Sequence, residues 1–129
     1  MSAYTIPDGE YGARMRKFKQ NIRAAGLDAA LVHGNEGDAA NVRYLSEYWP
    51  TFETAGVFVP AKGSAVLVIG PESLDYAKDR SKIKRIEKMV EYRESADPEY
   101  PGIPVASFKD VVKKAVPGGK IKKLGLVGY

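Results

Sequence analysis

Hydrophobic side chains recur at helical spacing near the start of the chain. Within residues 10–25 the apolar positions lie four, three, four and three residues apart, at Tyr11, Met15, Phe18, Ile22 and Ala25. This spacing places them on one stripe of a helix, with basic residues around it. We expect Asp8 to cap the helix and Gly26 to end it, because glycine enters the left-handed conformation without a Cβ clash.

Apolar runs without helical spacing predict the strands. Residues 29–32 are wholly apolar, which is typical of a strand buried on both faces of a sheet. Residues 55–59 and 64–69 are rich in β-branched residues and flank the short turn 60–63, so they predict a hairpin. The remaining strands are expected at residues 86–92 and 124–127.

Short helices are expected between these strands. They are predicted at residues 39–45 with Asp38 as the cap, at 72–80 after Pro71, and at 108–115 behind a capping box of Ser107 and Asp110. Polar or proline-rich segments predict loops at 33–38, 47–54 and 95–104. Helices that alternate with apolar strands, plus one hairpin, predict a single α/β domain over residues 1–129. Its mixed sheet would carry helices on both faces, in three α/β/α layers.

The core of this domain should be formed by the inward-facing apolar residues. We expect them to include Phe18, Ile22, Leu31, Val57, Val59, Val66, Val68, Val111 and Leu126. With 129 residues, of which 44% are hydrophobic, the chain is large enough to bury such a core.

Composition narrows the class of protein. No apolar run approaches the roughly 20 residues of a membrane span, and residues 1–9 lack a signal-peptide pattern, so a cytoplasmic protein without a membrane partner is expected. The absence of cysteine excludes disulfides, a thiolate nucleophile and cysteine-ligated zinc. The net charge of +4 comes partly from basic clusters at 14–23 and 78–88. We interpret these clusters as solvated faces without the aromatic stacking platform of a nucleic-acid site, and expect no nucleic acid as a partner.

The sequence offers few residues for catalysis. His33 is the one histidine, so no two-histidine metal site can form within the chain. It follows the first strand, where open α/β sheets bind ligands, and so it is either a loop histidine bonded to backbone or a ligand or partner contact. The glycine-rich segment 33–38 fits neither phosphate-binding motif. Acidic residues fall on helix patterns, which argues against a magnesium-dependent nuclease site.

An aromatic segment is the most unusual feature of the chain. Tyr44, Tyr48, Trp49 and Phe52 fall within nine residues, beside Arg43. They either cover one end of the sheet or form a binding surface, since tryptophan, tyrosine and arginine are enriched at interfaces. We expect a surface that faces a substrate or a partner subunit, made of His33, Arg43, Tyr48 and Trp49.

The order of these motifs resembles the N-terminal domain of the creatinase/prolidase family. Leu27–Val32 (LDAALV), Asn41–Tyr48 (NVRYLSEY) and Gly56–Val59 (GVFV) are similar to the family order of helix, GLDALLV, NxxYLTGY and hairpin. The closing LGLVG also matches in order, and the resemblance covers nearly the whole chain. Ser46-Glu47 replaces the family's Thr-Gly.

This resemblance implies a ribonuclease-H-like α/β/α fold and a longer parent protein. The parent would be a metallopeptidase, an Xaa-Pro dipeptidase or aminopeptidase, whose C-terminal catalytic domain is absent from this chain. That domain would bind two divalent metal ions, manganese, cobalt or zinc, so no catalytic residue, cofactor or metal ligand is expected here. The N-terminal domain would support a homodimer and lend loop residues to the neighbouring active site. The alternatives are a free-standing binding or dimerisation module and a domain of a creatinase-like amidinohydrolase.

Overall fold

A mixed five-stranded sheet forms the centre of the molecule. The computed structural model describes residues 5–50, 53–93 and 102–128, and the strands are β1 (Ala29–Gly34), β2 (Ala55–Pro60), β3 (Val66–Ile69), β4 (Ile86–Lys88) and β5 (Leu124–Val127). Their order across the sheet is β4-β3-β2-β1-β5. The β1–β2 and β2–β3 pairs are antiparallel, which includes the predicted hairpin, whereas β1–β5 and β3–β4 are parallel.

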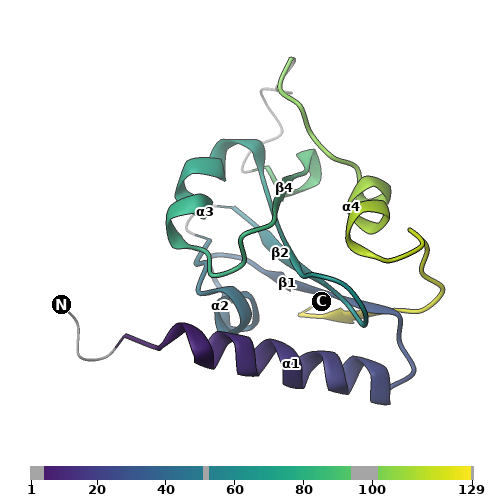
Figure 1. The fold of residues 1–129 in the computed structure, drawn as a ribbon. Coiled ribbons are helices and arrows are strands. Elements are labelled where there is room, and N and C mark those ends of the chain that lie inside the picture. Colours follow the sequence, from purple (N-terminus) through teal and green to yellow (C-terminus); the bar gives the residue numbers. More distant parts are fainter. Residues whose placement is uncertain (1–4, 51–52, 94–101, 129) are drawn as a thin grey trace.

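Helices cover both faces of this sheet (Figure 1). They are α1 (Asp8–Ala24), α2 (Ala40–Ser46), α3 (Leu74–Arg80) and α4 (Phe108–Ala115), with 3-10 turns η1 (Pro71–Ser73) and η2 (Val90–Tyr92). Helices α1, α2 and α3 lie on one face and α4 lies on the other. The predicted three-layer α/β/α arrangement is therefore confirmed.

Strand β1 divides its side chains between the two layers. Ala30 and Val32 belong to the hydrophobic cluster under α1, α2 and α3, whereas Ala29 and Leu31 belong to the cluster under α4. This division follows from the pleat, which points successive side chains to opposite faces. An apolar residue at every position of 29–32 is thus what a central strand with helices on both sides requires.

Gly63 fixes the turn between β2 and β3. Its φ is +116°, and a Cβ at this position would collide with the carbonyl oxygen of Ala115 at the end of α4. On the other side of the turn, Lys19 donates a hydrogen bond to the Gly63 carbonyl oxygen and Arg23 donates one to the carbonyl oxygen of Ala61. The turn therefore contacts both helical layers.

Two predicted helix ends are confirmed. After α1, Gly26 has φ +74° and the amide of Leu27 donates to the carbonyl oxygen of Ile22 at 3.0 Å, which is a Schellman ending. At the start of α4, the Ser107 hydroxyl accepts from the Asp110 amide while the Asp110 carboxylate accepts from the Ser107 amide. This is the reciprocal capping box that the spacing predicts.

Two predicted helix caps are wrong. Asp8 is the first residue of α1 rather than its cap, and its carboxylate instead lies 2.7 Å from Lys82 Nζ. Asp38 does not cap α2, because the cap residue is Ala39. The turn before α2 is stabilised by Asn35, whose side-chain oxygen accepts from the amides of Gly37 and Asp38.

The fourth strand is shorter than predicted. β4 ends at Lys88, and η2 follows in place of the second half of the predicted strand. Met89 and Tyr92 both enter the cluster under α4, and their spacing of three residues suits a 3-10 turn rather than a strand. The predicted loop at 95–104 lies mostly outside the described residues.

Most of the predicted core is buried. Ile22, Val57, Val59, Val66, Val68 and Val111 are buried, whereas Phe18 and Leu31 are only partly buried. The prediction for Leu126 is wrong, because its side chain is 60% exposed. β5 is an edge strand, so a side chain there has a neighbouring strand on one side only. None of the helices in the described ranges is long and apolar enough to cross a membrane.

Candidate functional site

An exposed tryptophan stacked on an arginine marks the most distinctive surface of the molecule. Helix α2 ends at Ser46, and the following residue, Glu47, caps it in a left-handed conformation with φ 63°. Trp49 follows and is 49% exposed. The guanidinium carbon of Arg43, in the last turn of α2, lies 4.4 Å from the centre of the Trp49 ring. This distance is within the range of a cation–π contact, and we call the pair the Arg43–Trp49 surface.

The loop that carries Trp49 is anchored in the core by its neighbours. Tyr48 and Pro50 are fully buried on either side of the exposed tryptophan. The Tyr48 hydroxyl donates to a carboxylate oxygen of Glu53 at 2.7 Å, and its ring packs edge-on against Tyr76 with centres 5.5 Å apart. Tyr76 in turn donates its hydroxyl hydrogen to the carbonyl oxygen of Trp49 at 3.2 Å. Trp49 is therefore held in place by contacts on both sides.

Burial also sets the protonation of this anchor. Burial, together with the carboxylate of Glu53, raises the pKa of the Tyr48 phenol well above its usual value. The phenol consequently keeps its proton and remains the donor to Glu53. The expectation that Tyr48 is exposed to a partner is wrong, because its side chain is completely buried.

A second arginine lies beside this surface, between two tyrosines. The guanidinium carbon of Arg14, on α1, lies 4.3 Å from the ring centre of Tyr44 and 5.1 Å from that of Tyr11. Arg14 also donates to the carbonyl oxygen of Tyr44 at 2.9 Å and forms an ion pair with Glu10. The sequence interpretation missed this stack, although Tyr11 and Arg14 are three residues apart on one helix and so share a face.

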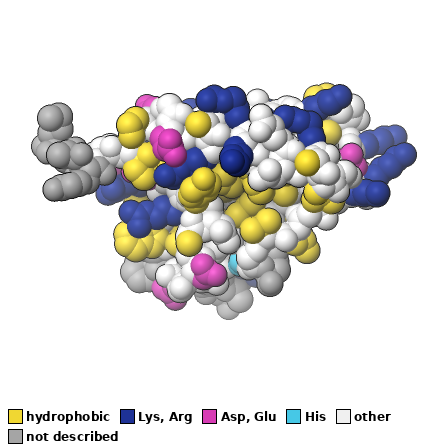
Figure 2. Space-filling model, turned by 90° about the horizontal axis from the view of Figure 1, so that it is seen from below, with side chains coloured by type: hydrophobic (Ala, Val, Ile, Leu, Met, Phe, Trp, Pro, Cys, Tyr) yellow, Lys and Arg dark blue, Asp and Glu magenta, His cyan; other side chains and the backbone are white. Residues whose placement is uncertain are grey.

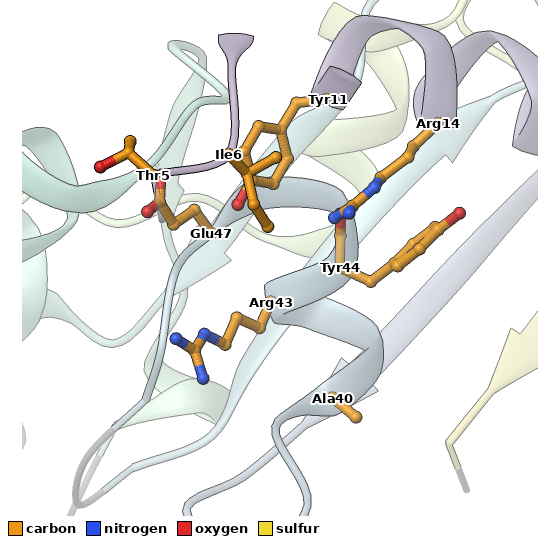
Figure 3. A pocket seen from close by; sticks show the side chains of 8 residues that line it. All are labelled: Thr5, Ile6, Tyr11, Arg14, Ala40, Arg43, Tyr44 and Glu47. Atoms are coloured by element: carbon orange, nitrogen blue, oxygen red, sulfur yellow. The ribbon is translucent and has the colours of Figure 1, made fainter. Parts of the chain in front are cut away.

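The two arginines line an open depression of about 450 Å³ (Figure 3). Figure 3 shows Arg14 extending along Tyr44, whereas Arg43 points away from it. The depression is lined by Thr5, Ile6, Tyr11, Arg14, Ala40, Arg43, Tyr44 and Glu47. A neighbouring depression of about 270 Å³ adjoins Trp49 and shares Arg43 with the first. Arg43 and Glu47 thus line both depressions.

Among the described residues, Arg43 forms no ion pair, although carboxylates lie close by. The Glu47 carboxylate lies 3.5 Å from Lys82 Nζ, which also contacts Asp8 at 2.7 Å. The side chain of Arg43 is exposed, and its guanidinium lies over the ring of Trp49. A guanidinium in this state suits bidentate binding of a carboxylate.

His33 lies apart from this surface. It belongs to β1, where it pairs with Gly56, and its ring centre lies 6.2 Å from that of Tyr92. Tyr92 is part of the cluster under α4, whereas the hollow beside Trp49 is lined by α3 residues such as Tyr76 on the opposite face. Odd-numbered residues of β1 point toward α4, so the structure does not bring His33 to Arg43 and Trp49.

Basic side chains surround hydrophobic ones on the α1 side of the molecule (Figure 2). Arg16 and Lys17 are exposed there, whereas Lys19 is tied to the β2–β3 turn. Burial and the nearby charge of Arg23 lower the pKa of Lys19. The first basic cluster of the sequence therefore contributes partly to solvent-exposed charge and partly to the attachment of α1 to the sheet.

Comparison with known proteins identifies the fold family. The model of the creatinase/prolidase N-terminal domain matches residues 14–128. The chain belongs to this family. The order of motifs that suggested the resemblance, from the strand at 29–32 to the closing LGLVG, falls within the matched residues. No curated protein matches the chain at a significant level.

Solved structures of peptidases contain similar domains. The N-terminal domain of the cytoplasmic peptidase PepQ from Mycobacterium tuberculosis is 31% identical, with a TM-score of 0.52, over 60% of this chain and 55% of its own. An Xaa-Pro aminopeptidase P from Streptococcus thermophilus is 27% identical, with a TM-score of 0.57, over 90% of this chain and 73% of its own. The prolidase from Pyrococcus horikoshii shares the fold at 21% identity and a TM-score of 0.59, over 88% of this chain. The chain spans only 25% of that prolidase.

The described part of this creatinase/prolidase N-terminal domain does not fit a two-metal centre. Within residues 5–50, 53–93 and 102–128, no three histidine or acidic side chains come close enough together to hold a metal ion. Several of the acids are occupied elsewhere: Asp28 and Asp110 accept from backbone amides, Asp8 pairs with Lys82 and Glu53 accepts from Tyr48. The Arg43–Trp49 surface instead presents an exposed aromatic ring and a guanidinium.

Proposed function

We propose that this domain is the non-catalytic N-terminal domain of an Xaa-Pro-type metallopeptidase, and that its Arg43–Trp49 surface faces the active site of a neighbouring subunit in a homodimer. The observation that carries the proposal is an exposed tryptophan that buried neighbours hold in one position against an arginine without an ion pair in the described chain. Tryptophan and arginine dominate binding energy at protein interfaces. A surface that only covered the sheet would need neither this exposure nor this fixed geometry.

The chemistry of the surface fits a peptide substrate. Arg43 can bind the terminal carboxylate of a dipeptide through two parallel N–H···O bonds, and Trp49 can pack against an apolar ring such as that of proline. The polypeptide that carries this domain would hold its two divalent metal ions, manganese, cobalt or zinc, in its C-terminal catalytic domain. The cytoplasm is the location we propose, a proposal supported by the M. tuberculosis relative, which is a cytoplasmic peptidase.

The proposal is tested in the polypeptide that the complete reading frame encodes. Trp49→Ala and Arg43→Ala should each lower kcat/KM on an Xaa-Pro dipeptide by at least about tenfold, as loss of an interface hot spot does. Arg16→Ala is the matched control, because it removes the same charge from an exposed position on α1. Sedimentation velocity should detect a dimer and show whether the two substitutions at the surface weaken it.

The outcomes separate the possible roles of the surface. A loss of activity with an intact dimer indicates that the surface faces substrate, and a loss of both indicates that it supports the subunit interface. If the two variants are folded and keep both the dimer and the kinetics of the wild type, then the surface is only cover for the sheet and the proposal fails.

The isolated 129-residue chain should not hydrolyse Xaa-Pro peptides, even with added manganese or cobalt. Activation of water by a metal requires several ligands on one site, and the described residues contain no group of three such side chains placed to hold a metal ion. The assay follows release of proline by the purified chain. Metal-dependent turnover that stays with the protein through further purification would contradict the assignment of catalysis to another domain.

A further inference from the structure

An apolar cavity of about 310 Å³ lies between α4 and the sheet, on the face opposite the Arg43–Trp49 surface. In Figure 1, α4 lies on this side of the sheet, opposite α1, α2 and α3. The cavity is lined by Leu31, Phe58, Val68, Met89, Tyr92, Phe108, Val111 and Leu124. The Tyr92 hydroxyl is the one polar side-chain group among them, and it lies against Gly56, where a Cβ would be 2.7 Å away.

The volume of this cavity lies in the range of small-molecule sites. An apolar cavity of about 150 Å³ stays dry and binds benzene, and small-molecule pockets begin at roughly 300 Å³. A void of this volume offers water almost no hydrogen-bond partners, so an apolar guest stabilises it better than water does.

The lining favours an aromatic guest. Phe58 and Phe108 meet edge to face, with ring centres 5.6 Å apart and planes at 85°. Tyr92 adds a third ring and Met89 adds a thioether. Aromatic edges and faces, and the sulfur of methionine, all make favourable contacts with a further planar ring.

The cavity has a closed floor and an open rim. Phe58, Val68 and Val111 are almost fully buried and form the floor. Leu31, Phe108 and Leu124 are partly exposed, so the guest can enter between α4 and the strands β1 and β5. We propose that this cavity is a binding site for a small aromatic molecule of one or two fused rings. The site does not depend on the proposed function, because it lies on the other face of the sheet.

Indole is the probe for the test. Added to the isotope-labelled chain, it should shift the methyl resonances of Val68, Val111 and Leu124 along saturable curves, while the indole N–H of Trp49 stays in place. Leu124→Phe should weaken binding by at least about tenfold, because the added ring fills the space that the guest needs. Leu126→Phe is the matched control: it is the same substitution on the same strand and the same side of the sheet, at a residue that is 60% exposed and does not line the cavity.

Two results would overturn the proposal. The first is a set of shifts that grow linearly without saturation, or that fall at Trp49 rather than at the lining methyls, because both indicate adventitious contact. The second is equal affinity of wild type and Leu124→Phe. If Leu124→Phe does not fold, Leu31→Phe replaces it, with the same expected loss of indole affinity. The shift map of the wild type shows independently whether indole enters the cavity.

Discussion

At the scale of single residues, Tyr48 fixes the position of its exposed neighbour. Tyr48→Phe removes the hydrogen bond to Glu53, a carboxylate that is only 8% exposed. We expect the free energy of unfolding to fall by about 1–3 kcal/mol, because a buried acceptor loses a donor. Trp49 is the single tryptophan of the chain, so its fluorescence can follow urea unfolding directly.

Tyr44→Phe is the control for this prediction. The ring of Tyr44 is 54% exposed, and its hydroxyl makes no hydrogen bond to a described residue. Deletion of this hydroxyl should leave the urea midpoint unchanged. Equal effects of the two substitutions would mean that the bond between Tyr48 and Glu53 does not hold the loop.

Substitutions at Gly63 and Gly118 distinguish the conformational cost of replacing a glycine from the steric cost. Both have positive φ, but a Cβ at Gly63 would strike the carbonyl oxygen of Ala115, whereas a Cβ at Gly118 would meet nothing within 4 Å. Gly118→Ala should therefore cost about 1 kcal/mol for backbone conformation alone, and Gly63→Ala clearly more. Chemical denaturation of both variants measures the difference, and similar costs would show that the β2–β3 turn can move away from α4.

The candidate site was predicted in part at this scale. The composition of the segment 43–49 correctly singled out Arg43 and Trp49 as exposed. It could not separate Trp49 from Tyr48, because both are large aromatics in a loop and only the contacts with Glu53 and Tyr76 decide which one is buried. His33 was expected beside Arg43 and Trp49 but lies on the other face, because the sequence does not show which face of the sheet the odd-numbered residues of β1 line.

At the scale of elements, the capping box of α4 contributes a measurable stability. Ser107→Ala removes the acceptor for the Asp110 amide and should destabilise the protein by about 1 kcal/mol. Ser64→Ala is a suitable control, because Ser64 is exposed and its hydroxyl is in no hydrogen bond within the described chain. Thermal unfolding of both variants measures this contribution. An unchanged midpoint for Ser107→Ala would show that the cap adds no stability.

Elements with strong local signals were predicted well, and those shaped by distant contacts were not. Helix α1 and the β2–β3 hairpin follow from spacing and turn residues alone. The end of β4 does not follow from local sequence. The amide of Met89 still donates to the carbonyl oxygen of Ile69 at 2.9 Å, and the chain then turns into η2. That turn brings Tyr92 over Gly56, a neighbour 36 positions earlier that no local pattern reveals.

At the scale of the whole molecule, Asp28 joins the start of β1 to the start of β5. One of its carboxylate oxygens accepts from the amides of Lys122 and Lys123, at 2.7 and 2.9 Å. These two backbone hydrogen bonds lower the pKa of Asp28 from its ordinary 3.8. A carboxyl with a depressed pKa in the folded state contributes stability above its unfolded pKa and loses it as the pH falls through the folded value.

Asp28→Asn should therefore make the protein less stable near neutral pH but less sensitive to acid. The difference in unfolding free energy between wild type and variant should be constant above about pH 5 and shrink as the pH falls below the unfolded value. Urea titrations across this range measure it. A difference that does not change with pH would show that the two amides do not depend on the charge of Asp28.

The pairing of β1 with β5 has a consequence for how the protein is made. Ala29 pairs with Leu124 and Val32 pairs with Val127, so the most apolar strand near the start of the chain shares an edge with the last strand described. During synthesis, which proceeds from the N-terminus, β2 becomes available soon after β1, but the other edge of β1 stays open until Val127 has left the ribosome. The nascent chain thus exposes one edge of β1 until β5 has been made, and an unpaired strand edge is a template for pairing with another chain.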